Sequence, residues 1–328
     1  MRRAMHMAAT ARTHARPNPW VGAVVVCVDG SVFEGATQPP GGPHAEIVAL
    51  AAATAVGADV RGATLYSTLE PCSHTGRTGP CTTAIIDAGI AHVVAAITDP
   101  DSNVSGNGFT QLRTAGVHVT EGICAEEATA QLAPYLHHRR TGRPFVMLKM
   151  ASTLDARTFI PNGPRWITGE EARIRVHQLR AESDAILVGA ETVRTDDPQL
   201  TVRSVDGASP RRIVLSHSGD IAPSAKVHPC TVWNDDLDAL LDSLGTDGVI
   251  QLMIEGGPTV ATEFHSRGLI NRYVFHIAPT VSGSDTAPGI FVGDVPLPLT
   301  DCHVVSVTAL GQDLEIVMDP IREKAGTP

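Results

Sequence analysis

Aromatic residues and positive charge are both scarce in this sequence. Phe, Trp and Tyr make up only 4% of its 328 residues, and acidic side chains outnumber basic ones to give a formal net charge of −10. Proteins that hold nucleic acid over a broad surface normally present a basic face and stacking aromatic rings. The composition therefore argues against nucleic acid as a partner, and any phosphate must be bound locally.

Long apolar runs are also missing. The longest one, residues 47–56, is mostly alanine and is interrupted by Thr54, so it is too short to span a bilayer. Arg2 and Arg3 are not followed by the apolar segment of a secretory signal. The six cysteines are scattered, at positions 27, 72, 81, 124, 230 and 302, which is not the pattern of a disulfide framework. We expect a soluble cytoplasmic protein without membrane contacts, internal repeats or low-complexity tracts.

What the sequence does contain is a metal-ligand set. His44, Cys72 and Cys81 supply one imidazole and two thiolates, which suit a zinc ion that keeps its fourth position for water and lowers the pKa of that water to about 7. Glu46 is a carboxylate that could carry protons between the water and a leaving group. This order is the signature of zinc nucleobase deaminases. Either half alone could be a chance match or buried thiols, but together they favour catalysis.

The spacing of the two cysteines departs from the general signature. Two residues usually separate them, whereas here eight do, residues 73–80. His74 and Arg77 lie in this insert and would place cationic donors at the mouth of the site. Such donors suit an anionic substrate, in particular a phosphate.

Apolar strands alternate with helical segments in the first half. We predict strands over residues 23–28, 31–36, 63–69, 92–98 and 117–119, and helices over residues 5–15, 45–56, 82–88, 109–115 and 125–138. This alternation is typical of an α/β sheet covered on both faces. The polar, basic stretch 137–144 reads as a linker, with His137 and His138 at a solvated helix end. We therefore expect two domains, residues 1–142 and 145–328.

The second half continues the alternation. We predict strands over residues 145–150, 185–188, 211–215, 231–233, 252–254 and 272–278, and a terminal hairpin of 304–310 with 314–318. Lys149 is the only charge in the first strand, so it lies at an edge or points into a site. Thr168 and Glu171 form a capping box that predicts a helix to about residue 181. Residues 255–259 are either a phosphate cradle or a tight turn.

Almost the whole chain resembles one family, the bifunctional riboflavin-biosynthesis deaminase/reductases of the RibD/RibG type. The matching motifs are residues 18–22, 43–46, 69–81, 148–149, 154–155, 166–168, 192–193, 196–203 and 255–259, in the family's order. The long insert between the two cysteines is that family's own form.

The resemblance implies an α/β protein in which a cytidine-deaminase-like three-layer domain precedes a dihydrofolate-reductase-like α/β domain. The first would deaminate 2,5-diamino-6-ribosylamino-4(3H)-pyrimidinone 5′-phosphate with Zn²⁺. The second would use NADPH to reduce 5-amino-6-(5-phosphoribosylamino)uracil to the ribitylamino product. Its partners would be small phosphorylated pyrimidines, with no nucleic acid or membrane, and the chain would form a dimer or tetramer.

By matched position, the resemblance also implies site residues. In the deaminase, His44, Cys72 and Cys81 would bind zinc, Glu46 would shuttle protons, and Asn18, His74 and Arg77 would contact substrate. In the reductase, Lys149 would be catalytic, and the substrate-facing residues would be Arg180, Leu200, Arg203 and Glu255. The residues lining the NADPH site would be Ala151, Trp166, Thr192, Asp196, Ser216, Gly257, Pro258 and Thr259. Asn18 lies between two prolines, and the alternative is that it only stabilises its own turn.

Three positions depart from the family pattern. Thr37 stands where family members often have a His, and Ala156 stands where the family's turn usually has a Gly. Pro164 stands where a Ser often contacts substrate. They bear on substrate contacts and not on the metal.

Two other functions are compatible with parts of the sequence. A nucleic-acid-editing deaminase with an accessory domain would need the basic or aromatic surface that is missing. A non-enzymatic zinc module joined to a nucleotide-binding regulatory domain would normally use four protein ligands, and only three are evident. NADPH oxidation that begins only after deamination of a diaminopyrimidine would distinguish the enzyme from both.

Overall fold

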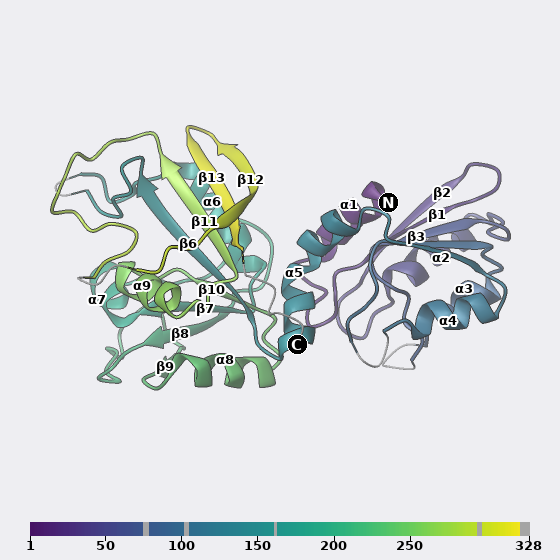
Figure 1. Cartoon of the computed structure of the whole chain (residues 1–328), viewed down its shortest axis with the longest axis horizontal. Helices are drawn as coiled ribbons and strands as arrows, with labels where there is room; N and C mark the ends of the chain where they lie inside the picture. Colours follow the sequence, from purple (N-terminus) through teal and green to yellow (C-terminus); the bar gives the residue numbers. More distant parts are fainter. Residues whose placement is uncertain (75–78, 102–104, 161–162, 294–296, 322–328) are drawn as a thin grey trace. The chain divides into compact units, whose positions relative to one another are not determined.

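We describe the protein from a computed structural model, which covers residues 1–74, 79–101, 105–160, 163–293 and 297–321. The chain divides into two compact units, Met1–Gly142 and Arg143–Pro328 (Figure 1). Among the helices in these residues, none has the length and apolarity needed to cross a membrane.

The first unit is built on a five-stranded sheet. Its strands are β1 (Gly22–Val26), β2 (Val32–Ala36), β3 (Thr64–Ser67), β4 (His92–Ala95) and β5 (His118–Glu121), and its helices are α1 (Arg2–Ala11), α2 (Ala45–Ala55), α3 (Cys81–Asp87), α4 (Asn107–Thr114) and α5 (Ala125–Thr141). The strand order is β2-β1-β3-β4-β5. β1 runs antiparallel to both β2 and β3, whereas β3, β4 and β5 are parallel.

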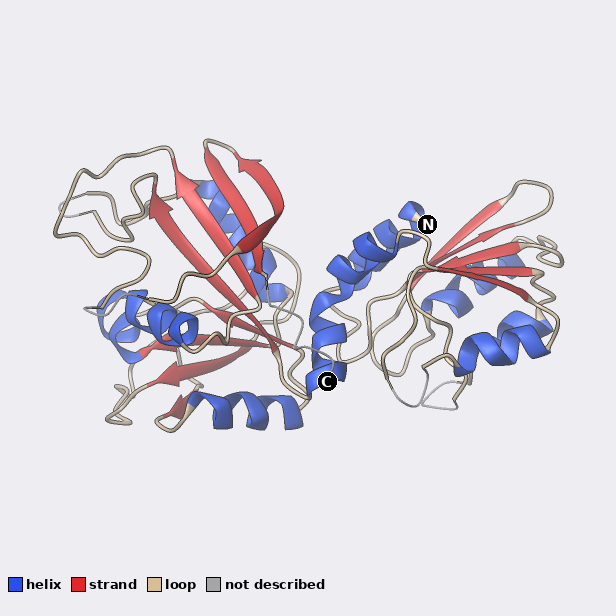
Figure 2. Ribbon diagram, viewed as in Figure 1, coloured by secondary structure: helices blue, strands red, loops and turns tan. Residues whose placement is uncertain are grey.

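Two glycines let helices approach opposite faces of this sheet. Gly35 pairs with Ala23 across β1 and β2, so Gly22 and Gly35 face opposite sides, because successive strand residues alternate. A Cβ atom on Gly22 would lie 1.8 Å from the carbonyl oxygen of Ala4 in α1, and one on Gly35 would lie 2.1 Å from that of Ala45 in α2. The unit therefore has the three-layer helix–sheet–helix arrangement that the alternation predicts (Figure 2).

The second unit is built on an eight-stranded mixed sheet. Its strands are β6 (Phe145–Thr153), β7 (Ala185–Gly189), β8 (Arg211–Leu215), β9 (Thr231–Trp233), β10 (Gln251–Ile254), β11 (Arg272–Ala278), β12 (Cys302–Leu310) and β13 (Asp313–Pro320), and its helices are α6 (Glu170–Ala181), α7 (Ala190–Asp196), α8 (Leu237–Thr246) and α9 (Pro258–Ser266). The order is β12-β13-β11-β6-β10-β7-β8-β9. The hairpin β12–β13 is antiparallel, β13 joins β11 antiparallel, and the other neighbours are parallel.

β6 supplies side chains to cores on both faces of this sheet. Leu148 packs in a cluster with Leu240 and Phe264 from α8 and α9, while Met147 packs with Val176 and other residues from α6. Lys149 follows the same alternation and lies on the α6 face. Because β6 has neighbours on both sides, Lys149 is not at a sheet edge, and the alternative that it points into a site remains.

Some local predictions are wrong. α5 continues to Thr141, so residues 137–141 are helical and not a linker. α6 begins after Gly169 with no side-chain cap, and the predicted capping box of Thr168 and Glu171 is not formed. Asp313 from the distant hairpin instead accepts the Gly169 N–H at 2.7 Å. A contact between residues so far apart in sequence could not be seen from the local motif.

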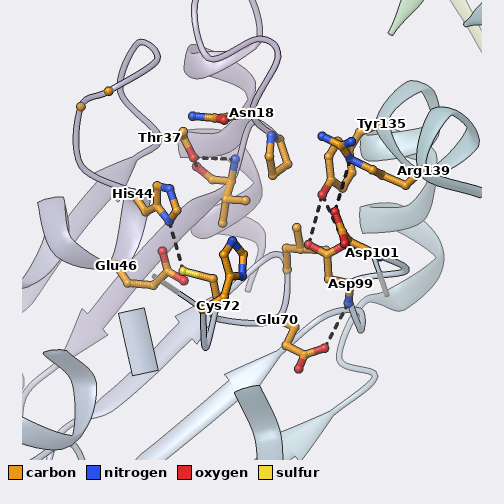
Figure 3. Close-up of a pocket in the computed structure, with 16 residues that line it drawn as sticks. Asn18, Thr37, His44, Glu46, Glu70, Cys72, Asp99, Asp101, Tyr135 and Arg139 are labelled. Atoms are coloured by element: carbon orange, nitrogen blue, oxygen red, sulfur yellow. Dashed lines mark hydrogen bonds and ion pairs between the residues drawn. The ribbon is translucent and has the colours of Figure 1, made fainter. Parts of the chain in front are cut away.

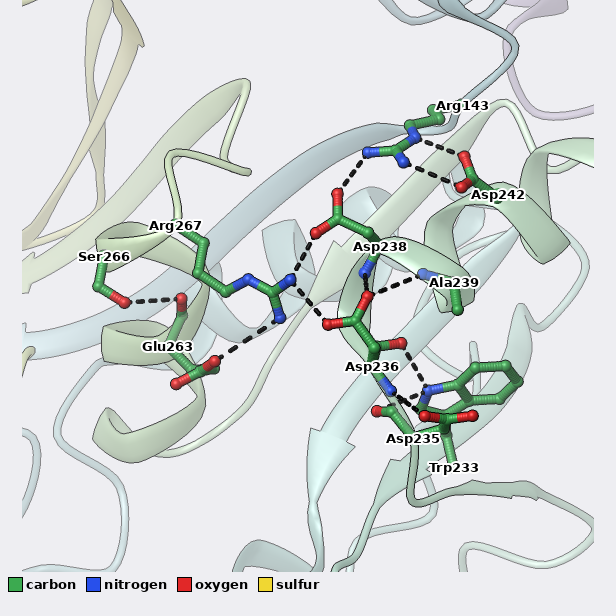
Figure 4. A network of polar contacts seen from close by, with 10 residues as sticks. All are labelled: Arg143, Trp233, Asp235, Asp236, Asp238, Ala239, Asp242, Glu263, Ser266 and Arg267. Atoms are coloured by element: carbon green, nitrogen blue, oxygen red, sulfur yellow. Dashed lines mark hydrogen bonds and ion pairs between the residues drawn. The ribbon is translucent and has the colours of Figure 1, made fainter.

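The first residue of the second unit is tied to α8 by charge. Arg143 forms ion pairs of 2.6 Å with both Asp238 and Asp242. Asp238 also contacts Arg267, which pairs with Asp236 at 2.8 Å (Figure 4). Networks of this kind fix geometry better than isolated surface pairs do, so the chain enters β6 in a defined direction.

Candidate active sites

Three metal-ligand side chains from different segments converge in the first unit. The Nδ1 atom of His44 lies 3.5 Å from Cys72 Sγ and 3.3 Å from Cys81 Sγ. The three donor atoms are all within 4.8 Å of one another, and they form the one such group of three found in the described residues. The sequence predicted this set, and the fold brings it together.

Two helix N-termini position these ligands. His44 is the N-cap residue of α2 and Cys81 is the first residue of α3, while the Cys81 N–H donates to Cys72 Sγ at 3.4 Å. The positive end of a helix favours thiolate. Hydrogen bonds from the Cys81 side chain and from His44 lower the pKa of the Cys72 thiol. Two sulfur donors and one imidazole fit zinc with an open fourth position.

Glu46 lies in the first turn of α2, beside these ligands. Its side chain is only 3% exposed, and burial together with the nearby Cys72 raises the pKa of Glu46 to about 7. A carboxyl group that can hold or release a proton near neutral pH is suited to general acid–base work. Figure 3 shows its carboxylate directed toward Cys72.

His44, Glu46 and Cys72 line a pocket of about 240 Å³. Asn18 and His74, both predicted to contact substrate, line it, as does Thr37. The Thr37 hydroxyl accepts the Val21 N–H at 3.0 Å and so braces the strand end beside Asn18. Arg77 lies outside the described residues.

The other side of the pocket carries polar residues that the sequence analysis missed. Tyr135 donates to the buried Asp99 at 3.2 Å, and Arg139 lies 3.8 Å from Asp101 (Figure 3). Burial raises the pKa of Asp99. The position of Asp99 after β4 was a signal for a site residue, whereas Arg139 was mistaken for part of a linker.

Glu70 anchors the loop that carries Asp99. Its buried carboxylate accepts backbone N–H groups of Asp99 at 3.2 Å, Gly106 at 3.0 Å and Gly108 at 2.9 Å. The motif residue before Pro71 thus has an architectural role, because it holds the backbone N–H groups of Asp99, Gly106 and Gly108.

A second polar site lies where parallel strands of the second unit end. Lys149 on β6 is 7% exposed, and Arg180 from α6 makes a two-pronged ion pair with Glu255, at 2.8 and 2.7 Å. Burial lowers the pKa of Lys149, while Glu255 opposes that effect. The carboxyl edge of a parallel sheet is the usual place for ligand sites.

The loop 200–203 joins this cluster. Arg180 also donates to the Thr201 carbonyl at 3.1 Å, and the Arg203 N–H donates to His177 Nδ1 at 3.2 Å. Leu200 is buried and has a φ of 55°, a strained conformation for such a residue. Arg180, Leu200, Arg203 and Glu255, predicted to face substrate, therefore belong to one neighbourhood.

The residues predicted to line the NADPH site follow the same strand ends. Gly257 is the N-cap of α9, which starts with Pro258 and Thr259. The free backbone N–H groups at such a helix N-terminus suit a phosphate group of a dinucleotide. Ala151 is on β6, Ser216 directly follows β8, and Thr192 and Asp196 are on α7.

Trp166 is exposed, at 59%. Its ring lies beneath the guanidinium groups of Arg165 and Arg173, and Arg165 donates to the Asp196 carbonyl at 3.2 Å. The structure thus brings Trp166 and Asp196 into one local group.

Family models match both units. Residues 1–97 match the cytidine and deoxycytidylate deaminase zinc-binding region, and residues 144–316 match the RibD C-terminal domain. Together they cover the three metal-ligand residues and the Lys149 cluster.

Whole-chain relatives give the same result. The chain is 38% identical to the riboflavin biosynthesis protein RibD of Aquifex aeolicus over 96% of each chain, and 41% identical to that of Mycobacterium tuberculosis over 81% of this chain and 80% of the relative. The solved structure of Acinetobacter baumannii RibD is 34% identical, with a TM-score of 0.88 and 98% of each chain covered. A Thermotoga maritima structure described as a diaminohydroxyphosphoribosylaminopyrimidine deaminase and 5-amino-6-(5-phosphoribosylamino)uracil reductase is 33% identical, with a TM-score of 0.86, 98% of this chain and 97% of that chain covered.

Proposed function

Since this chain belongs to the RibD family of bifunctional deaminase/reductases of riboflavin biosynthesis, we propose which compounds it converts and which residues do so. The first unit deaminates 2,5-diamino-6-ribosylamino-4(3H)-pyrimidinone 5′-phosphate. The second reduces the ribosyl group of 5-amino-6-(5-phosphoribosylamino)uracil to ribityl. The solved Thermotoga relative carries both activities in its description.

In the deaminase, His44, Cys72 and Cys81 would hold zinc, which would supply an activated water. Glu46 would carry the proton to the departing amino group, as its buried position beside the ligands permits. Asn18 and His74 orient the pyrimidine, and Arg77 binds the phosphate. The single observation that carries the proposal is the convergence of the three donor atoms beside the buried Glu46 carboxylate.

In the reductase, NADPH supplies a hydride when bound. We assign its site to Ala151, Trp166, Thr192, Asp196, Ser216 and Gly257–Thr259. Arg180, Leu200, Arg203 and Glu255 hold the sugar phosphate and orient its C1′ atom. As C1′ gains the hydride, its bond to the ring oxygen breaks, and Lys149 donates the proton that this oxygen needs.

The domain extents that go with this function are residues 1–142 for the deaminase and 145–328 for the reductase. The two compact units support this division. We further propose that the enzyme works in the cytoplasm, because a zinc site with two thiolate ligands suits a reducing compartment.

We propose that the chain forms a homo-oligomer. β12 is an edge strand of the second sheet, and its Val304 and Val307 side chains are 58% and 59% exposed. Exposed apolar edge strands are normally covered, and a second copy is the simplest cover. Light scattering combined with size-exclusion chromatography gives the mass in solution; a monomer at micromolar concentration would contradict the proposal.

The test of function supplies the diaminopyrimidine and NADPH to zinc-loaded protein and follows ammonia release and NADPH oxidation. Ammonia should appear first, and NADPH consumption should require it. Glu46→Gln should deaminate at least about a hundredfold more slowly, the lower end of the effect of general acid–base groups, and should keep its zinc. Glu34→Gln, on β2 outside the pocket, is the matched control. A near-normal rate in Glu46→Gln would exclude its proton-shuttle role.

A further inference from the structure

A cluster of buried charge lies next to Lys149 and is not used by the mechanism above. Glu315 on β13 is 5% exposed and His276 on β11 is fully buried. Arg175 on α6 reaches Glu315, with its Nε atom 3.0 Å from the carboxylate. Burying an ionised carboxylate costs much free energy unless it is paired and hydrogen-bonded.

The contacts of His276 define the protonation of this cluster. Its Nε2 atom lies 3.0 Å from the Glu315 carboxylate, whereas its Nδ1 atom is buried with no hydrogen-bond partner in the described part of the chain. A neutral ring that donates from Nε2 leaves only a lone pair unsatisfied, while a charged ring would leave a buried N–H donor unpaired. His276 is therefore a neutral donor.

Glu315 keeps its negative charge in this setting. Burial alone would raise the pKa of Glu315, but the hydrogen bond from His276 and the charge of Arg175 outweigh it, so that this pKa lies below its usual value. The carboxylate is thus a fixed anion inside the sheet-to-helix layer.

The strand register places this anion near Lys149. Lys149 pairs with Val274 on β11, and His276, two residues further along β11, pairs with Glu315 on β13. Paired residues on neighbouring strands share a face and lie about 5 Å apart, so these side chains occupy the α6 face together. The charge of Glu315 acts on Lys149 and opposes the effect of burial on its pKa.

The other charged groups around Lys149 come from α6 and from the end of β10. Arg180 and Glu255 are bound to each other, and burial lowers the pKa of His177, which also lies on α6. Glu255 is therefore already paired with a cation, Arg180, in the region assigned to substrate. Glu315 is a second anion near Lys149 and lies on its β13 side.

We propose that Glu315, held by His276 and Arg175, is a positioning residue of the reductase: its fixed charge keeps the Lys149 side chain protonated and oriented to donate. This inference rests on the proposed role of Lys149 in reduction. When C1′ gains a hydride and its bond to the ring oxygen breaks, the proton passes from the Lys149 ammonium to that oxygen. Lys149 then regains a proton from solvent.

The ionisation of Lys149 can be measured without substrate or NADPH. The chain has only three lysines, at positions 149, 226 and 324, so NMR of the full-length protein labelled with ¹³C- and ¹⁵N-lysine gives few signals. Lys226→Arg helps to assign them. Lys149 should titrate at lower pH in Glu315→Gln than in the unmodified protein, because the substitution removes an anion but keeps the shape and the hydrogen-bond acceptor.

Two further variants sharpen the test. Glu182→Gln removes a carboxylate that contacts the same Arg175 at 3.4 Å but is not among the charges that act on Lys149, so the Lys149 titration should not move. Glu315→Met removes the same negative charge with an apolar side chain of similar length, so the Lys149 titration should again move to lower pH. This variant tests the proposal even if Glu315→Gln does not fold.

The reductase assay links the titration to function. On the alkaline side of its pH profile, Glu315→Gln should reduce supplied deaminated intermediate about tenfold more slowly, since one pKa unit changes the protonated fraction tenfold. An unchanged Lys149 titration in folded Glu315→Gln would overturn the proposal, as would a shifted titration with an unchanged pH profile. Absence of reduction in the unmodified protein would instead refute the proposed function, and the titration would still report on Glu315.

Discussion

At the scale of the residue, Cys81 is the most constrained of the metal-ligand side chains. It is fully buried, opens α3, and contacts both His44 and Cys72. A serine at this position would keep the size but offer a poor zinc ligand, because the alkoxide is not available at neutral pH.

We therefore predict that the purified protein holds about one zinc per chain, as a three-ligand site with one open position implies, and that Cys81→Ser loses it. Metal content by mass spectrometry measures this directly. Cys302→Ser, in the second unit, should keep its zinc. Full occupancy in Cys81→Ser would remove Cys81 from the ligand set.

Ala156 offers a residue-scale test of backbone strain. Its φ is +61°, in the left-handed region that costs a residue with a Cβ atom about 1–2 kcal/mol. Ala156→Gly removes this strain but makes the unfolded chain more flexible. The net result should be an increase of about 0.5–1 kcal/mol in the free energy of unfolding. Ala239→Gly in α8 should lower it by about 1 kcal/mol, because that position is helical. Urea unfolding of both variants measures these changes, and a loss of stability in Ala156→Gly would contradict the strain.

The site residues differ in how far the sequence could predict them. His44, Cys72 and Cys81 belong to short motifs with a defined chemistry, so their types and spacing were sufficient. Asp99 and Tyr135 carry no motif and meet only because the segment after β4 packs against the middle of α5. Such a meeting depends on the packing of the unit, which local patterns do not contain.

At the scale of the element, the residue that caps the N-terminus of α6 differs between the sequence prediction and the structure. The local motif predicts a capping box from Thr168, whereas the Gly169 N–H donates to Asp313 at 2.7 Å. Asp313 is 3% exposed, so its loss leaves a helix terminus without its acceptor. Because α6 carries both Arg175 and Arg180, this contact also fixes the reductase site.

Asp313→Ala should therefore lower stability by about 1 kcal/mol, the usual effect of removing a helix cap. Thr168→Val, which keeps the shape, should change it by no more than about 0.5 kcal/mol, as for sites without a special contact. Thermal unfolding followed by circular dichroism compares the two. An equal or larger loss in Thr168→Val would restore the capping box as the main contact.

Several strands follow the sequence closely. β8, β9 and β11 begin and end where the patterns predict, because each is rich in the β-branched and aromatic residues that favour strands. α8 was missed although Asp236 and the spacing of Leu237, Leu240, Leu241 and Leu244 mark a helix. The family match confirms the predicted fold class, a deaminase-like α/β domain followed by a reductase α/β domain.

At the scale of the whole molecule, the two sites lie in different units. The described metal-ligand and pocket residues fall within Met1–Gly142, and the described residues assigned to reduction fall within Arg143–Pro328. Each site should therefore be removable without the other. Glu46→Gln should still reduce supplied deaminated intermediate with NADPH, whereas Lys149→Ala should release ammonia from the diaminopyrimidine but consume little NADPH.

Mixing these two variants extends the prediction to the complete reaction. The intermediate released by Lys149→Ala can diffuse to Glu46→Gln, so the mixture should consume NADPH after ammonia appears, with a lag that shortens as the concentration of Glu46→Gln rises. Ammonia and NADPH are followed in each variant and then in the mixture. If folded Glu46→Gln cannot reduce supplied intermediate, the two sites depend on each other. If only the mixture fails, the sites are separate but the intermediate must pass within one assembly, because a freely diffusing compound would reach either protein.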